Sequence, residues 1–171
     1  GMVALADPSQ SGSAAAAYGM IVQSAPDWPA GWGRLLSVLG NANRFYDSAG
    51  DAANAPGLGE ALVATCIDFY GAIRVKDSPD MLVYVSPRGE TAFSPDPIAV
   101  LKNPPNPELA NRFVRFVLSL EGQMLWALPP GAKGGPRRNS LGRHPIRRDV
   151  YAVAADRLSP WISNPYEGGQ E

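Results

Sequence analysis

The opening run Val3-Ala-Leu-Ala-Asp-Pro-Ser-Gln-Ser-Gly-Ser13 decides the fold class. Residues 3–6 are apolar and have the length of a short strand, and the residues after them are rich in turn-forming Asp, Pro, Ser and Gly. An alanine-rich stretch over 14–23 follows and predicts a helix. The small residues at 9–13, called the Ser loop below, therefore lie at the positive end of a helix, where backbone N–H groups are free.

The alternation of strand and helix continues along the chain. Residues 61–67 form a continuous apolar run whose length suits a buried strand of a parallel sheet, and it leads into residues 68–70. Such an order predicts an α/β sheet with parallel pairs, in which ligands bind beyond the carboxyl ends of the strands. We expect both the Ser loop and residues 68–70 at that edge. The other predicted strands cover 45–46, 81–85 and 97–102, and the other predicted helices cover 30–40, part of 47–59, 106–120, 121–128 and 149–158.

Composition narrows the class of protein. The chain has 171 residues, 45% of them hydrophobic and 18% charged, which is enough for the core of a single domain. No apolar run reaches the roughly 18 residues of a membrane-spanning helix. A net charge of −1 argues against a general nucleic-acid binder. The single cysteine, Cys66, excludes an internal disulfide and a multi-thiolate metal site, and its apolar neighbours indicate a small buried hydrophobe.

The run 3–13 resembles the entry into the second lobe of bacterial extracellular solute-binding proteins of ABC importers, and is closest to the branch that includes ferric-ion-binding proteins. Further motifs resemble the same family, in the same order, over residues 3–151. Whole proteins of this family have two lobes and longer chains, so the resemblance implies a fragment with one lobe largely complete. The motifs are Gly31-Trp32, Gly59-Glu60 followed by Ile67-Asp-Phe-Tyr70, Ser94-Pro-Asp-Pro-Ile-Ala99, Asn106-Pro-Glu-Leu-Ala110, Phe116-Val-Leu-Ser-Leu-Glu-Gly-Gln123 and Arg143-His-Pro-Ile-Arg-Arg-Asp-Val150.

The resemblance implies an α/β fold, namely a three-layer αβα lobe with a mostly parallel sheet, resembling one lobe of a type II periplasmic binding protein. It implies a single α/β domain over residues 2–171. Within that domain, 3–72 would form the second-lobe-like core and 73–128 the strands and helix that return through the hinge. Residues 129–171 would form a basic loop and a C-terminal segment.

The candidate ligand-binding residues come from the Ser loop and from the run after the apolar strand. Hydroxyls and a glycine at a helix N-terminus suit an anionic group, although capping of the helix by serine explains the same pattern. Tyr70 occupies a position like one of the paired tyrosines that ligate ferric ion in the iron-binding members, but its neighbour is Phe69, which favours an aromatic wall of the cleft. Asp68 either accepts a hydrogen bond from the ligand or caps the strand end. The expected site comprises Ser9, Ser11, Gly12, Ser13, Asp68 and Tyr70, with no metal ligand and no catalytic residue.

The resemblance implies a binding protein without catalytic activity and without a cofactor. Its expected partners are a small-molecule or ion ligand and the membrane subunits of an ABC transporter, with no nucleic acid. A severed lobe would also expose an apolar face that could pair two copies as a homodimer. The expected location is the periplasm or the cell exterior, and a membrane anchor is compatible with it.

Two other interpretations of the residues stay open. The alternative function is a small hydrolase acting on a phosphate or acyl ester, with His144, the only histidine, as the base beside Ser11 or Ser13. Residues 129–148 hold six of the fifteen cations. This basic cluster could serve a domain that binds a nucleic acid or another partner. The simpler expectation is a solvated loop or a surface that pairs with the missing lobe.

Overall fold

The computed structural model describes residues 1–87, 89–139 and 141–168. The chain folds into two compact units, Gly1–Ala92 and Phe93–Glu171. None of the helices in the described part of the chain has the length and apolar character that crossing a bilayer requires.

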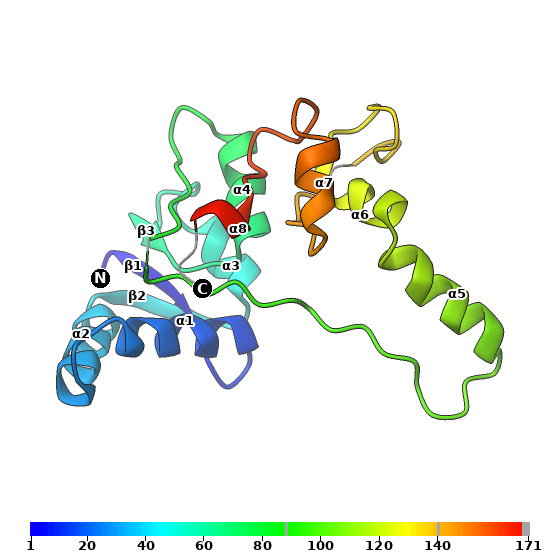
Figure 1. The fold of residues 1–171 in the computed structure, drawn as a ribbon. Coiled ribbons are helices and arrows are strands. Elements are labelled where there is room, and N and C mark those ends of the chain that lie inside the picture. The colour runs from blue at the N-terminus through cyan, green and yellow to red at the C-terminus, as the bar shows by residue number, and fades with distance from the viewer. Residues whose placement is uncertain (88, 140, 169–171) are drawn as a thin grey trace. The chain divides into compact units, whose positions relative to one another are not determined.

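In the described part of the first unit, the strands form a three-stranded parallel sheet in the order β2-β1-β3 (Figure 1). The central strand β1 (Val3–Ala6) pairs with β2 (Ala42–Tyr46) on one side and with β3 (Val63–Ala64) on the other. Leu5 lies opposite Phe45, and an irregularity between Val3 and Ala4 shifts the register of this pair. The parallel pairing follows from the helical connections between strands, as in a βαβ unit.

The first three helices described in this unit begin at polar caps that are visible in the sequence, whereas the fourth follows Ile67 and has no side-chain cap. The side chains of Ser11, Asp27 and Ser48 each accept a hydrogen bond from the backbone N–H three residues further on. Such caps satisfy N–H groups that have no partner within the helix. The helices are α1 (Gly12–Gln23), α2 (Trp28–Gly40), α3 (Ala49–Asn54) and α4 (Asp68–Asp77).

The side chains of β1 alternate between two apolar clusters. Leu5 is fully buried in one cluster with Tyr18 and Leu35, which come from α1 and α2. Ala4 and Ala6 belong to the other cluster, with the alanines of α3. Because successive side chains of a strand point to opposite faces, helices cover the sheet on both sides. The predicted α/β class is therefore confirmed, with a parallel sheet between helical layers.

Three predicted strands differ in the structure. The run 61–67 contributes only Val63 and Ala64 to the sheet, and Leu62 and Val63 are 73% and 57% exposed. Residues 81–85 and 97–102 form no strand. An extended segment becomes a strand only when a neighbouring backbone bonds to it, and prolines at 95 and 97 remove two such donors.

The regular elements in the described part of the second unit are all helices, separated by long irregular segments. A small core of Ala127, Val150, Tyr151 and Ile162 joins α6 to the segment around α7. The predicted helix 106–120 ends at Val117, and Ser119 caps a separate helix after it. The helices are α5 (Pro107–Val117), α6 (Leu120–Ala127), α7 (Arg148–Val153) and α8 (Pro165–Gly168).

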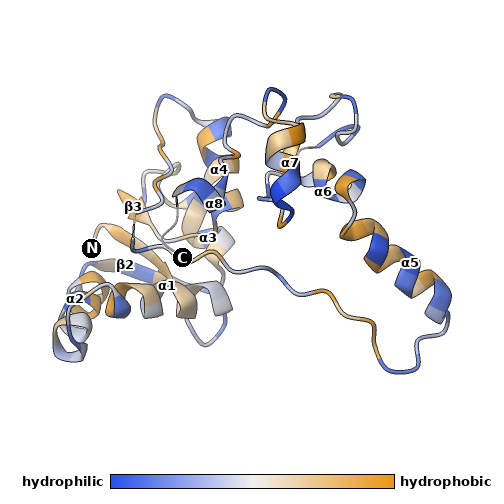
Figure 2. Cartoon of the chain, viewed as in Figure 1, coloured by the Kyte–Doolittle hydropathy of each residue, from blue (hydrophilic) through white to orange (hydrophobic). Residues whose placement is uncertain are grey.

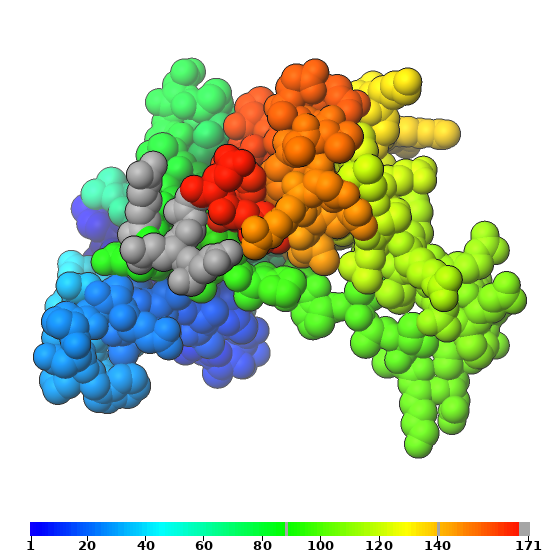
Figure 3. Space-filling view, viewed as in Figure 1, coloured from blue at the N-terminus to red at the C-terminus, as the bar shows by residue number. Residues whose placement is uncertain are grey.

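The helix α5 is strongly amphipathic, but its apolar face is exposed. Figure 2 shows hydrophobic and hydrophilic residues alternating along it, and Figure 3 shows it standing out from the rest of its unit. Leu109 and Phe113 are 59% and 60% exposed. Its sequence signals are therefore sufficient to predict a helix, but they do not predict burial of its apolar face.

Candidate functional site

The carboxyl ends of the three parallel strands meet at one edge of the sheet in the first unit. The segment 7–11 follows β1, Asp47 and Ser48 follow β2, and residues 65–67 lead from β3 into α4. The chain passes from β1 to a strand on one side, while β3 lies on the other side. This makes the loop after β1 the topological switch point, which is where ligands bind in open α/β sheets.

The Ser loop lies at this switch point as a compact turn. The backbone N–H groups of Gln10 and Ser11 both donate to the carbonyl oxygen of Asp7, at 3.1 and 2.9 Å. The Ser11 hydroxyl accepts from the N–H of Ala14 at 3.3 Å and lies 3.0 Å from the hydroxyl of Ser13. Ser11 therefore caps α1, as the simpler of the two interpretations predicts.

Space remains open beside this turn. Ser9 and Gly12 are exposed, while Ser11 and Ser13 are partly buried. Apart from its two chain neighbours and the backbone of α1 itself, no described atom lies within 4 Å of where a Cβ on Gly12 would stand. A ligand atom can thus approach the first turn of α1 closely, where the helix dipole favours negative charge.

A carboxylate that sequence reasoning did not include lies in the same turn. The Asp7 carboxylate accepts from the Ser9 N–H at 2.8 Å, and the hydroxyl and amide of Ser9 lower the pKa of Asp7. The Tyr18 hydroxyl donates to the Ala6 carbonyl at 2.7 Å, and burial together with the charge of Asp7 raises the pKa of Tyr18. The turn therefore presents hydrogen-bond donors beside a fixed negative charge. The signal for Asp7 was its place directly after the strand.

Asp68 and Tyr70 lie in the first turn of α4 instead of at the end of a long strand. Asp68 accepts from the N–H of Phe69 at 2.8 Å. The Phe69 and Tyr70 rings are in contact, with centroids 4.4 Å apart. Tyr70 packs on the cluster that contains Ala6 and Ala14, so its ring and the first turn of α1 share one apolar cluster.

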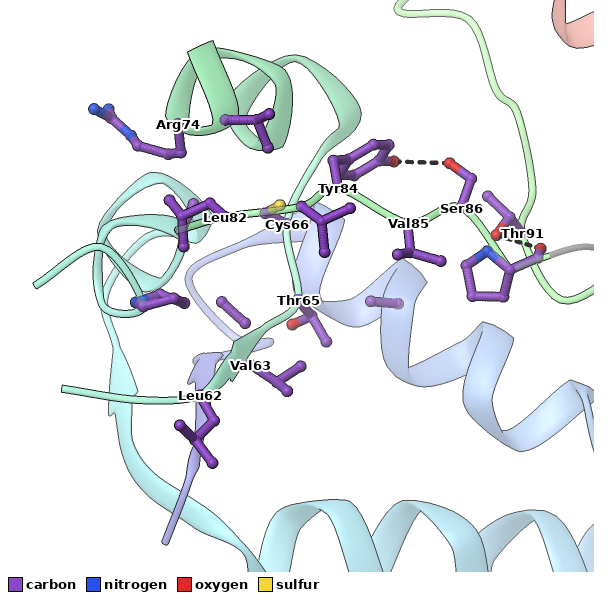
Figure 4. Close-up of a pocket in the computed structure, with 18 of the residues that line it drawn as sticks. Leu62, Val63, Thr65, Cys66, Arg74, Leu82, Tyr84, Val85, Ser86 and Thr91 are labelled. Atoms are coloured by element: carbon purple, nitrogen blue, oxygen red, sulfur yellow. Dashed lines mark hydrogen bonds between the residues drawn. The ribbon is translucent and has the colours of Figure 1, made fainter. Parts of the chain in front are cut away.

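A groove that the sequence did not predict runs along the open edge of β3 (Figure 4). It has a volume of about 580 Å³ and lies between β3, the extended segment 81–87, and one side each of α1 and α4. Its wall is mostly apolar and includes Cys66 and Tyr84. Burial raises the pKa of both groups, and the negative charge of Asp68 adds to this shift. The Tyr84 ring lies directly on Gly71, where a Cβ would overlap it.

The remaining candidate residue is the only histidine of the sequence. His144 belongs to the second unit, where its ring meets that of Phe93 edge-on at 6.1 Å. Over residues 1–87, 89–139 and 141–168, no group of three or more His, Cys, Asp or Glu side chains could hold a metal ion.

Most of the chain matches a known protein family. The profile of a family described as "Bacterial extracellular solute-binding protein" matches residues 2–127. Two curated proteins, from Salmonella typhimurium (strain LT2) and Salmonella typhi, are both called phosphoglycerate transport regulatory protein PgtC. Each is 31% identical to this chain over 100 residues, which cover 58% of this chain and 24% of the relative. The match thus spans about a quarter of the length of these relatives. No solved structure matches.

Proposed function

The chain belongs to the family of bacterial extracellular solute-binding proteins, and we propose that it captures a small anionic or metal-containing ligand for an ABC import system. In this proposal it binds and releases the ligand without catalysing a reaction. It works in the periplasm or at the cell exterior and delivers the ligand to the membrane subunits of the transporter. The observation that carries the proposal is the Ser loop, which lies at the switch point of a parallel sheet inside the matched region.

The proposed binding residues are Ser9, Ser11, Gly12, Ser13, Asp68 and Tyr70. In this proposal an anionic group of the ligand meets the first turn of α1, where the approach at Gly12 is open. Tyr70 forms an aromatic wall on the shared cluster. A second lobe closes over this edge by a hinge motion.

The negative charge of Asp7 refines the ligand chemistry. A simple anion would be repelled by this carboxylate, whose lowered pKa keeps it ionised. A ligand that carries both an anionic group and a hydroxyl satisfies the turn better, because the hydroxyl donates to Asp7 while the anion faces the helix N-terminus. Phosphoglycerate, which appears in the name of the two relatives, has this combination and is therefore the first ligand to test.

The test is native mass spectrometry and titration calorimetry on the protein purified from its host without refolding. The ligands are 3-phosphoglycerate, inorganic phosphate and ferric citrate. Ser13→Ala and Tyr70→Ala are expected to weaken binding, the former by about 10- to 100-fold if its hydroxyl bonds a charged group. Ser37→Ala is the matched control, because the Ser37 hydroxyl donates to the Gly33 carbonyl within the exposed part of α2. Equal affinity in all the variants would overturn the site.

A further inference from the structure

The second unit carries a positive stretch that the proposed function does not use. Residues 129–148 contain six Lys or Arg and no Asp or Glu. Over residues 93–171 the net charge is +3, whereas over 1–92 it is −4. Such an asymmetry between two parts of one chain indicates a surface for a negatively charged partner.

Half of these six cations have neither a counter-ion nor an aromatic partner among the described residues. Arg143 pairs with Asp96, and Arg147 pairs with Asp149 at 2.6 Å. Arg148 lies over the ring of Tyr166 at 4.3 Å. The other three, Lys133, Arg137 and Arg138, are exposed and form no ion pair with any described residue.

Of the three cations, Lys133 lies within a hydrogen-bonded turn over residues 131–136, and Arg137 and Arg138 follow this turn directly. The Gly131 N–H donates to the Pro136 carbonyl at 2.9 Å and closes the turn, and Gly131 has a φ of +81° that favours glycine. A Cβ on Gly135 would lie 2.7 Å from the carbonyl oxygen of Pro129, so this position also requires glycine. Arg157 donates to the Lys133 carbonyl at 3.1 Å and ties the turn to the segment after α7. The backbone that carries Lys133 and leads into Arg137 and Arg138 is therefore held by hydrogen bonds, which lowers the entropy cost of binding.

We propose that this turn with the residues that flank it, 129–139, docks on the surface of an anionic phospholipid bilayer. Phosphate headgroups supply the missing counter-ions for Lys133, Arg137 and Arg138. Two apolar side chains nearby in sequence, Leu141 and Ile146, are 44% and 47% exposed and can enter the interface between headgroups and acyl chains. A bilayer is favoured over a nucleic acid because residues 129–148 contain no Phe, Tyr or Trp on which bases could stack.

The test is co-sedimentation of the full chain with vesicles of phosphatidylcholine mixed with phosphatidylglycerol, and with vesicles of phosphatidylcholine alone. Each cation near an anionic surface contributes about 1 kcal/mol, or roughly fivefold in affinity. Replacing Lys133, Arg137 and Arg138 together by Gln is expected to weaken binding to the mixed vesicles by about 100-fold. The matched control replaces Lys102, Arg112 and Arg115 by Gln, which removes the same charge from exposed positions of the same unit.

Each outcome decides the proposal. Binding that requires phosphatidylglycerol, weakens with added salt and is lost only in the turn variant supports it. An equal loss in the control variant would mean that net charge alone attracts the unit, and would overturn the assignment to this turn. Absence of vesicle binding at low salt would overturn it as well. So would binding to a single-stranded oligonucleotide in place of the vesicles. Circular dichroism of both variants checks that each is folded.

Discussion

Helices α1 and α2 cross closely and pack together on one face of the sheet. A single glycine makes this close approach possible. Gly31 is buried in α2, and a Cβ on it would overlap the carbonyl oxygen of Val22 in α1 and stand 3.0 Å from the Val22 Cγ1 atom. Gly33 lies in the same helix and is exposed, and outside its chain neighbours and the backbone of α2 no described atom lies within 4 Å of its Cβ position. Replacing each glycine by alanine therefore separates two effects on stability. Both variants gain helix propensity, but only Gly31→Ala introduces a steric overlap with α1.

The two substitutions are expected to change the free energy of unfolding in opposite directions. Alanine is more favourable than glycine inside a helix by about 1 kcal/mol, and both variants gain this amount. Gly31→Ala must also move the backbone of α1, and overpacking of this kind costs about 1–3 kcal/mol, here toward the upper end because the overlap is with main-chain atoms. We expect Gly31→Ala to lower the free energy of unfolding by about 2 kcal/mol, and Gly33→Ala to raise it by about 1 kcal/mol.

The assay is urea unfolding followed by circular dichroism, together with hydrogen exchange of the peptides that cover residues 12–40. The chain has two compact units, so the exchange data assign the change to the first one. Faster exchange over α1 and α2 in Gly31→Ala, with slower exchange in Gly33→Ala, agrees with the crossing. Equal stabilisation by both substitutions would refute the close contact between these helices.

Three further predictions concern the edge of the sheet that carries the candidate site. Tyr18→Phe removes the donor to the buried Ala6 carbonyl and is expected to lower the free energy of unfolding by about 1–3 kcal/mol in urea denaturation. Because its pKa is lowered in the folded protein, Asp7 stabilises the fold above its ordinary pKa of 3.8, and this contribution disappears as the pH falls through the folded value. An NMR titration should therefore show the pKa of Asp7 rising in Ser9→Ala. Burial raises the pKa of Cys66, so a thiol reagent should label the native chain more slowly than the urea-unfolded chain at neutral pH, and equal rates would contradict this.

Most helices of both units could be predicted from sequence because their signals are local, whereas α4, which begins without a side-chain cap, and the short α8 were not predicted. A cap such as Ser11 or Asn106 accepts a hydrogen bond from an N–H only three residues away. Apolar residues likewise recur at helical spacing within one or two turns. The first strand was also predictable, since a short apolar run followed by a turn-forming cluster precedes a helix in a βαβ unit. These signals were sufficient for the α/β class and for the place of the Ser loop at the end of β1.

The strands at the open edge were not predictable, because a strand exists only through its neighbours. Residues 81–85 have the composition of a strand, yet Val83 is 81% exposed and the segment borders the groove beside β3. Tyr70 packs against α3, and the charge of Asp7 acts on Tyr18, only because the tertiary fold brings these elements together. The sequence by itself determined the elements whose bonds close within a few residues, together with the family. Only the tertiary structure decided which extended segments found a partner and which charges share the site, because those contacts join residues that are distant in the chain.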